Sequence, residues 1–356
     1  MKLKEFQDIL KKRKIDFALF FNLNPIEADH NLFYFSGYSG IGVLVIGQKK
    51  AFLLVPKMEY EKARKSRIRK VYALDKKKLF DSVLEKIKKN KIKRKKIGID
   101  KSVVTLTEYS AFKKSFKKCK IANVSRICYE LRETKTKEEI RIIKKACQIT
   151  DKILTKCFKN FRRFKYETDV VVFLEQETRR SGCSFSFPPI VASGVSSSQP
   201  HYEPKPVRLK KGFCVIDFGI RYNGYCSDMT RTIYLGKPSR KEKEFYYLLL
   251  NVQTATIKKI EEERKTSKVV QFVKNNLGRY DKNFIHGLGH GIGVELHELP
   301  NLKETDKSRL KENNIFTIEP GIYFPGKFGI RIEDDVLLGK NVEVLTKVTK
   351  DLIIVN

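Results

Sequence analysis

The sequence predicts an α+β protein with two domains, a smaller α/β domain in residues 1–128 and a larger domain of helices and β-hairpins in residues 129–356. Three observations support this prediction. With 356 residues, of which 41% are apolar, the chain can bury two hydrophobic cores. Short apolar runs alternate with amphipathic stretches in the first 128 residues. Long helical patterns and two hairpin patterns dominate the rest.

The composition argues against a membrane-spanning or exported protein. No apolar run reaches the roughly 18 residues that span a bilayer, and the start, MKLKEFQDILKKRK, lacks the apolar core of a signal peptide. The seven cysteines form no CxxC pair, which argues against a disulfide framework or a zinc ribbon. We therefore expect a cytoplasmic protein without a membrane partner.

The formal net charge of +33 is unevenly distributed, because residues 1–130 hold 33 Lys and Arg against 13 Asp and Glu. The stretch KIKKNKIKRKK, residues 86–96, could attract nucleic acid through release of phosphate counterions. Lysine outnumbers arginine there, and no aromatic RNA-binding motif accompanies it. We therefore interpret these lysines as a solvated face and do not expect a nucleic-acid partner.

The first domain shows short apolar runs between polar amphipathic stretches, which is typical of a small α/β domain. The apolar runs are DFALFF (16–21), IGVLVIG (41–47), KAFLLV (50–55) and KIGID (96–100). The amphipathic stretches are KLKEFQDILKKRK (2–14), KMEYEKARK (57–65), DSVLEKIKKN (81–90) and EYSAFKKSF (108–116). No cluster of charged residues or histidines marks a catalytic site here, and we interpret His30 as a structural or surface residue and not as a ligand.

The pattern changes near residue 131, where a long helix is expected. Apolar residues recur at helical spacing from Ile140 to Leu154, and Thr136 with Glu139 fits a capping box. A second helix is expected in ETDVVVFLEQETRRSG (167–182), followed by strands and hairpins, with helices again from about 239 to 276.

The segment CVIDFGIRYNGYCSDMTRTIYL contains Asn223-Gly224 between two alternating apolar runs, a strong signal for a tight hairpin. If Tyr222 pairs with Tyr225, Asp217 faces Thr230. Asp217 and Asp228 then lie on one face at a diagonal Cβ separation of about 7–8 Å. Carboxylates this close repel each other unless protons or cations intervene, so the spacing suits shared metal ions.

A second hairpin is expected in IFTIEPGIYFPGKFGIRIEDDVLL. A five-residue loop, PGKFG, would pair Phe324 with Ile330 and place Glu319 and Glu333 on one face. Four inward-facing acids on two hairpins are difficult to explain as ordinary surface residues.

The stretch HGLGHGIGVELHE, residues 286–298, holds three of the five histidines among four glycines. It fails as a dinucleotide fingerprint because Ile292 stands where the third glycine is needed, and His297-Glu298 begins a zincin motif that Asn301 does not complete. The segment VASGVSSSQPHYEP contains no GxSxG nucleophile motif. A metal-ligand role for one imidazole, with glycines giving the backbone clearance, remains.

Together these motifs resemble the pita-bread metallopeptidases, and within them the Xaa-Pro dipeptidases, or prolidases. The resemblance covers most of residues 131–356, and NLFYFSGYSG with its surroundings resembles the amino-terminal domain of prolidases and creatinases. It implies a pita-bread catalytic domain preceded by a smaller creatinase-like α/β domain. It also implies hydrolysis of proline-containing dipeptides or short peptides, and a homodimer.

The resemblance implies two divalent metal ions per chain. Asp217 would chelate one ion, His290 and Glu319 the other, and Asp228 and Glu333 would bridge both. Such ions would activate a hydroxide at neutral pH. An oxygen-rich ligand set with one imidazole suits Mn, Co, Fe or Zn and does not select among them. With the resemblance, Mn or Co are the expected ions, and Zn or Fe are the alternatives.

The same resemblance assigns residues on the substrate side. His201 and His297 would contact the scissile amide and act in catalysis, and Glu319 would double as the general base. Arg331 would bind substrate or orient a carboxylate, with an ordinary ion pair as the alternative. His286 is left open between support of the ligands and simple packing.

Three functions fit these motifs. The leading one is an Xaa-Pro dipeptidase, because a single amino-terminal domain and a short chain favour dipeptides. An Xaa-Pro aminopeptidase acting on longer peptides would use the same residues. A non-catalytic pita-bread protein that binds through the basic amino-terminal domain is the alternative of another class, and loss of metal ligands would mark it. All five ligand positions are filled here.

Overall fold

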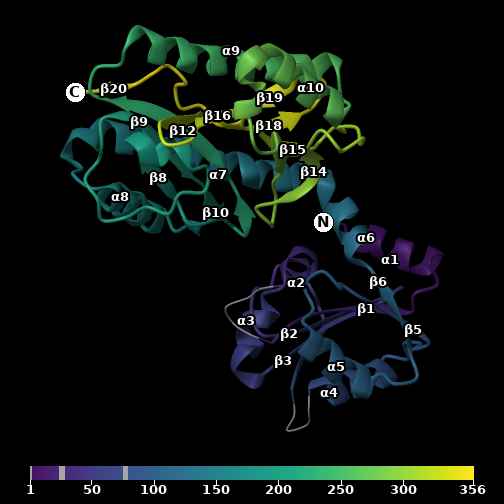
Figure 1. Cartoon of the computed structure of the whole chain (residues 1–356). Helices are drawn as coiled ribbons and strands as arrows, with labels where there is room; N and C mark the ends of the chain where they lie inside the picture. Colours follow the sequence, from purple (N-terminus) through teal and green to yellow (C-terminus); the bar gives the residue numbers. More distant parts are fainter. Residues whose placement is uncertain (1, 24–28, 75–78) are drawn as a thin grey trace. The chain divides into compact units, whose positions relative to one another are not determined.

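The computed structural model describes residues 2–23, 29–74 and 79–356, which mix helices and strands as the sequence predicts (Figure 1). The chain divides into two compact units, Met1–Leu131 and Arg132–Asn356. Helix α6 (Ser125–Glu133) contains this division. Within the described residues, no helix is both long enough and apolar enough to cross a membrane.

A six-stranded mixed sheet, in the order β4-β3-β2-β1-β5-β6, forms the centre of the first unit. Strand β1 is buried along its whole length, because helices cover both of its faces. Phe20 packs against the rings of Phe6 and Phe35 from α1 and α2. On the other face, Phe21 packs against Phe80 from α4. Burial on both faces explains the continuous apolar runs of the sequence.

The elements of the first unit follow the predicted alternation of helices and strands. Its helices are α1 (Leu3–Lys12), α2 (His30–Ser36), α3 (Tyr60–Arg64), α4 (Leu79–Lys89) and α5 (Leu106–Ser115). Its strands are β1 (Phe17–Asn22), β2 (Gly42–Gly47), β3 (Ala51–Val55), β4 (Val71–Ala73), β5 (Lys96–Ile99) and β6 (Lys120–Asn123).

The second unit places strands between two helix pairs (Figure 1). The predicted capping box is confirmed at the start of α7 (Lys137–Asn160). The Thr136 hydroxyl accepts from the Glu139 N–H, and the Glu139 carboxylate accepts from the Thr136 N–H. Helices α7 and α8 pack on one core, and α9 and α10 pack on another. The remaining helices are α8 (Glu167–Arg180), α9 (Arg240–Glu262) and α10 (Thr266–Leu277).

The strands of the second unit form four sheets among the described residues, in the orders β11-β10-β7, β20-β12-β9-β8, β14-β13-β15-β18-β19 and β16-β17. Those before α9 are β7 (Ser184–Phe185), β8 (Ile190–Ser193), β9 (Gly212–Phe218), β10 (Ile220–Tyr222), β11 (Tyr225–Cys226) and β12 (Met229–Leu235). Those after α10 are β13 (Gly289–Gly291), β14 (Glu298–Leu302), β15 (Ile315–Ile318), β16 (Gly321–Phe324), β17 (Phe328–Arg331), β18 (Asp334–Leu338), β19 (Val342–Val344) and β20 (Ile354–Val355).

The register predicted for the first hairpin is confirmed. Tyr222 pairs with Tyr225, and Asp217 on β9 pairs with Thr230 on β12. The opposite face, including Ile216 and Met229, is buried in the core beneath α7 and α8. The hydrophobic face therefore fixes the direction in which the acids point.

The register predicted for the second hairpin is wrong by two residues. Phe324 pairs with Phe328 and Ile322 with Ile330, so three residues form the turn instead of five. Side chains alternate faces with a period of two, and a shift of two residues therefore keeps every side chain on its predicted face. For this reason the expectation that Glu319 and Glu333 share a face survives the error.

A buried ion network lies directly beside Glu333. Asp334 accepts hydrogen bonds from Arg231 Nη2 at 2.7 Å, Lys350 Nζ at 2.8 Å and Gln253 Nε2 at 2.8 Å. Arg231 also donates to the carbonyl of Glu333. Burial alone would raise the pKa of Asp334, but the charges of Arg231 and Lys350 outweigh it and lower this pKa to about 2.

This network predicts a pH-dependent contribution to stability. Because the pKa of Asp334 is depressed in the folded state, its contribution is present above the unfolded pKa and is lost as pH falls through about 2. The difference in unfolding free energy between wild type and Asp334→Asn should therefore shrink by about 1 kcal/mol between pH 6 and pH 3. Urea unfolding of both proteins measures it, and a difference that does not change with pH would contradict the assignment.

Candidate metal centre

The nine residues singled out in the sequence line one pocket of about 470 Å³. They come from segments that are far apart in the chain, and the second unit contains all of them. The pocket brings together His201, Asp217, Asp228, His286, His290, His297, Glu319, Arg331 and Glu333.

Backbone hydrogen bonds between the hairpins hold the acids in place. The Glu333 N–H donates to the carbonyl of Thr230 at 3.1 Å, which joins the two hairpins. The Glu319 N–H donates to the carbonyl of Leu288 at 2.9 Å, which joins the second hairpin to the segment that carries His290. The acids therefore stand on rigid strands or directly beside them.

Three side chains form the centre of this arrangement. One ligand atom each from Asp228, His290 and Glu333 lies within 4.8 Å of the others. His290 Nε2 lies 3.6 Å from Asp228 Oδ2 and 3.6 Å from Glu319 Oε1. His290 Nδ1 donates to the Gly291 carbonyl at 3.1 Å, so the lone pair of Nε2 faces the acids.

The glycines on either side of His290 are required for close packing of β13 between its neighbours. A Cβ atom on Gly289 would lie 2.0 Å from the Thr317 carbonyl oxygen, and one on Gly291 would lie 2.1 Å from the Leu299 carbonyl oxygen. Any side chain at these positions would push β13 away from β14 or β15. The glycines thus provide clearance for the strand that presents His290.

The acids resist ionisation in the absence of cations. Burial, followed by repulsion from Glu333 and Asp217, raises the pKa of Asp228 well above its ordinary value. Burial, followed by repulsion from Glu319 and Asp217, does the same for the pKa of Glu333. Burial also raises the pKa of Glu319. The cluster is therefore a site where negative charge needs a compensating cation.

Two of the histidines, His290 and His297, have lowered pKa values. Burial, then the neighbouring His290, lowers the pKa of His297 to about 4, and burial lowers the pKa of His290 as well. The two rings lie 4.2 Å apart between centroids. Neutral imidazoles can bind metal or accept a proton at neutral pH, which is the form that either proposed role requires.

Arg331 is tied to its surroundings by four hydrogen bonds. Nη2 donates to Asp217 Oδ2 at 2.7 Å, and Nε donates to the Thr230 hydroxyl at 3.0 Å. Nη1 donates to the Tyr323 hydroxyl at 2.7 Å and to the Pro200 carbonyl at 3.2 Å. Of the alternatives left open by the sequence, this geometry favours a guanidinium that orients a carboxylate.

His286 lies behind this network. Its Nδ1 donates to the Gly287 carbonyl at 2.8 Å, so Nε2 accepts from the Tyr323 hydroxyl at 3.1 Å. Tyr323 in turn accepts from Arg331. His286 therefore supports Tyr323 and, through it, Arg331 and Asp217.

Three residues that support the site were not predicted from the sequence, Thr230, Thr317 and Tyr323. The Thr230 hydroxyl donates to Glu333 Oε2 at 2.6 Å. Thr317 accepts from the His290 N–H at 3.1 Å and donates to Glu319 Oε1 at 3.1 Å. Period-two alternation was the available signal for Tyr323, because it shares a strand face with Glu319 and Arg331.

The residues of this pocket fit divalent metal ions. Asp217 Oδ1 and Asp228 Oδ1 are buried and have no hydrogen-bond partner among the described residues. Buried carboxylate oxygens without partners are costly, and cations would satisfy them. Four carboxylates and one imidazole form a donor set suited to Mn, Co, Fe or Zn.

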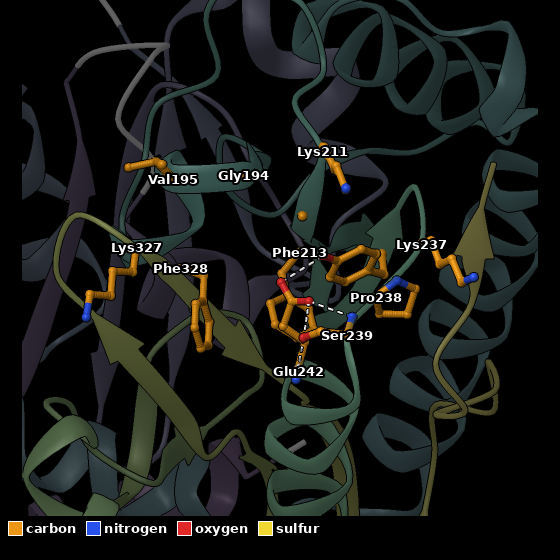
Figure 2. A pocket seen from close by; sticks show the side chains of 12 residues that line it. Gly194, Val195, Lys211, Phe213, Lys237, Pro238, Ser239, Glu242, Lys327 and Phe328 are labelled. Carbon is orange, nitrogen blue, oxygen red and sulfur yellow. Dashed lines mark hydrogen bonds between the residues drawn. The ribbon is translucent and has the colours of Figure 1, made fainter.

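A larger hollow of about 560 Å³ lies at the start of α9 and offers different chemistry. Figure 2 shows Glu242 there, hydrogen bonded to Ser239. The other carboxylate oxygen of Glu242 accepts from the Tyr234 hydroxyl at 2.7 Å. None of the nine residues lines this hollow, and both oxygens of its acid have partners. Size alone therefore does not identify the functional site.

Comparison with known proteins agrees with this geometry. Residues 141–340 match the family model of metallopeptidase family M24. The chain belongs to this family. Residues 2–134 match the creatinase/prolidase amino-terminal domain. The predicted architecture, a pita-bread metallopeptidase domain preceded by a creatinase-like domain, is confirmed.

Relatives of this M24 chain extend over nearly its whole length. An Xaa-Pro dipeptidase from Pyrococcus furiosus is 36% identical over 330 residues, which cover 91% of this chain and 92% of the relative. The structure of an Xaa-Pro dipeptidase from Bacillus anthracis has a TM-score of 0.90 at 33% identity over 99% of both chains. An X-Pro aminopeptidase from Thermotoga maritima has a TM-score of 0.88 at 30% identity over 97% of this chain and 99% of that chain.

Proposed function

We propose that this metallopeptidase hydrolyses the peptide bond before proline in Xaa-Pro dipeptides with the aid of two divalent metal ions. One observation carries the proposal. Asp228, His290 and Glu333 converge within 4.8 Å of one another inside a pocket that Asp217, Glu319 and the other histidines also line. The full-length similarity to Xaa-Pro dipeptidases supports the choice of substrate.

The five proposed ligands are Asp217, Asp228, His290, Glu319 and Glu333. Bound divalent ions would supply Lewis acidity and activate water as a nucleophile at neutral pH. We propose that Glu319 also accepts a proton during the reaction, since it lines the pocket and its Oε1 lies 3.6 Å from His290 Nε2.

His201 and His297 are proposed to contact the scissile amide. Both line the pocket, and His297 is neutral because burial and His290 lower its pKa to about 4. A neutral imidazole can donate one hydrogen bond to the developing oxyanion and accept a proton at its other nitrogen. The choice of Mn or Co, the homodimer and the cytoplasmic location stay predictions of the sequence.

The test compares hydrolysis of Ala-Pro with hydrolysis of Ala-Pro-Ala by protein loaded with Mn²⁺ or Co²⁺, before and after a chelator. We expect metal-dependent cleavage of the dipeptide that exceeds cleavage of the tripeptide. Preference for the tripeptide would instead establish an aminopeptidase. Cleavage of neither peptide, together with salt-dependent binding of RNA or DNA, would support the non-catalytic alternative.

A further inference from the structure

The substrate proposed above presents a recognition problem at its carboxyl end. The bond before proline has no N–H, so a site for Xaa-Pro must recognise the proline ring and the two charged termini. A free carboxylate in a partly buried pocket requires a cationic or hydrogen-bonding partner. The inference that follows rests on the proposed function and asks which residue supplies this partner.

Two basic side chains line the described pocket, Arg331 and Lys303. Arg331 is 4% exposed and already donates to Asp217, Tyr323, Thr230 and the Pro200 carbonyl. If Arg331 turned to bind a substrate carboxylate, these buried acceptors would lose their donor. The partner should therefore be the other cation.

Lys303 is placed at the pocket by β14, which it directly follows. The Leu288 N–H donates to the Leu302 carbonyl at 2.9 Å, and this bond brings Lys303 beside Gly287. A Cβ atom on Gly287 would lie 3.4 Å from Lys303 Cγ and 3.7 Å from Lys303 Cε, so the lysine stem runs along this glycine. The absence of a side chain at residue 287 thus leaves room for the lysine at the pocket.

Two features show that the charge of Lys303 is both close to the site and available. Lys303 lines the same pocket as His290 and His297. In the described parts of the chain, no carboxylate forms an ion pair with Lys303, and the adjacent Glu304 is paired with Lys274. An accessible lysine without an acidic partner can bind a carboxylate without breaking an existing pair.

The pocket also supplies apolar surface for a proline ring, since Phe187, Ile190 and Leu296 line it together with Lys303. A dipeptide places its carboxylate directly on the proline, whereas a longer peptide places a neutral amide there. A cation in the pocket therefore distinguishes the two substrate classes. We propose that Lys303 binds the terminal carboxylate of the Xaa-Pro substrate and is a determinant of dipeptide specificity.

The test uses full-length metal-loaded protein with Ala-Pro and its uncharged amide, Ala-Pro-NH₂. Lys303→Met keeps the stem and removes the charge, and should raise KM for Ala-Pro about tenfold while changing kcat little. Lys303→Arg should restore most of the affinity. KM for the amide should stay the same in all three proteins. The exposed Lys307, changed to Met, is the matched control for loss of a nearby positive charge.

Three outcomes would overturn the role of Lys303 alone. Lys303→Met could leave KM for Ala-Pro unchanged, or it could raise KM for Ala-Pro and KM for its amide by the same factor. The wild type could also prefer the amide, which would overturn the role of Lys303 while leaving metal-dependent peptidase activity intact. If metal-loaded wild type cleaves neither compound, the proposed dipeptidase function fails, and the role of Lys303 fails with it.

Discussion

Replacing Asp228 by alanine is expected to lower kcat/KM for Ala-Pro by about three orders of magnitude or more. Asp228 lies at the centre of the cluster, where its Oδ2 is 3.6 Å from His290 Nε2 and where Glu333 is also within reach. It is one of the residues that would hold the divalent ions, so its loss would remove a ligand from the centre of the site. Peptide hydrolysis by metal-loaded protein measures the effect.

Controls separate this effect from misfolding. The Asp228 backbone N–H donates to Asp335 Oδ2 at 2.9 Å, and the variant retains this bond. Asp351→Ala removes an exposed acid in the same unit and should leave activity unchanged. Circular dichroism of the metal-free proteins checks the fold. Activity of Asp228→Ala within tenfold of wild type would contradict the proposed role of Asp228 as a metal ligand.

The second large effect is on stability, where saturating Mn²⁺ or Co²⁺ should raise Tm by about 5–10 °C at pH 8. Metal binds the native state, in which the ligand carboxylates are already gathered. Burial and mutual repulsion raise the pKa values of Asp228 and Glu333. Binding should therefore release protons, and the affinity for metal should increase with pH.

The sign of the pH dependence follows from the direction of these shifts. A carboxyl whose pKa is raised in the folded state contributes stability below its unfolded pKa, and this contribution is lost as pH rises through the folded pKa. The metal-free protein should thus lose stability from this cluster as pH rises, and metal should restore it. The rise in Tm should be smaller at pH 6 than at pH 8.

Differential scanning calorimetry with and without metal measures this rise in Tm. Titration of groups remote from the site affects both samples equally and cancels in the difference. Asp351→Ala should show the same increase in Tm as wild type, whereas Asp228→Ala should show a smaller one. An equal melting temperature with and without saturating metal would contradict the metal site. A larger increase at pH 6 than at pH 8 would contradict the protonation argument.

The fold and the placement of the proposed ligand residues could be predicted wherever local chemistry determines geometry. Asn223-Gly224 fixes a two-residue turn, and that turn determines the register that pairs Asp217 with Thr230. Thr136 and Glu139 likewise define the start of α7. The register of the second hairpin was predicted wrongly, because several loop lengths are compatible with PGKFG.

Contacts between distant segments could not be predicted from local patterns. The pairing of Arg331 with Asp217 depends on how β17 meets β9, and the position of Lys303 depends on how β14 pairs with β13. The sequence shows Arg331 and Lys303 as two cations among 74 lysines and arginines. The fold distinguishes them. Arg331 is bound to Asp217 inside the protein, whereas Lys303 lines the pocket without an acidic partner among the described residues.

The central claim is that divalent ions held by Asp217, Asp228, His290, Glu319 and Glu333 carry the hydrolysis. The most direct measurement follows bound metal per chain and Ala-Pro hydrolysis in the same samples, as chelated protein is titrated with Mn²⁺ or Co²⁺. The account predicts that activity is absent without metal, rises with occupancy, and saturates when two ions are bound per chain. Full hydrolysis by protein from which the metal has been removed would contradict it.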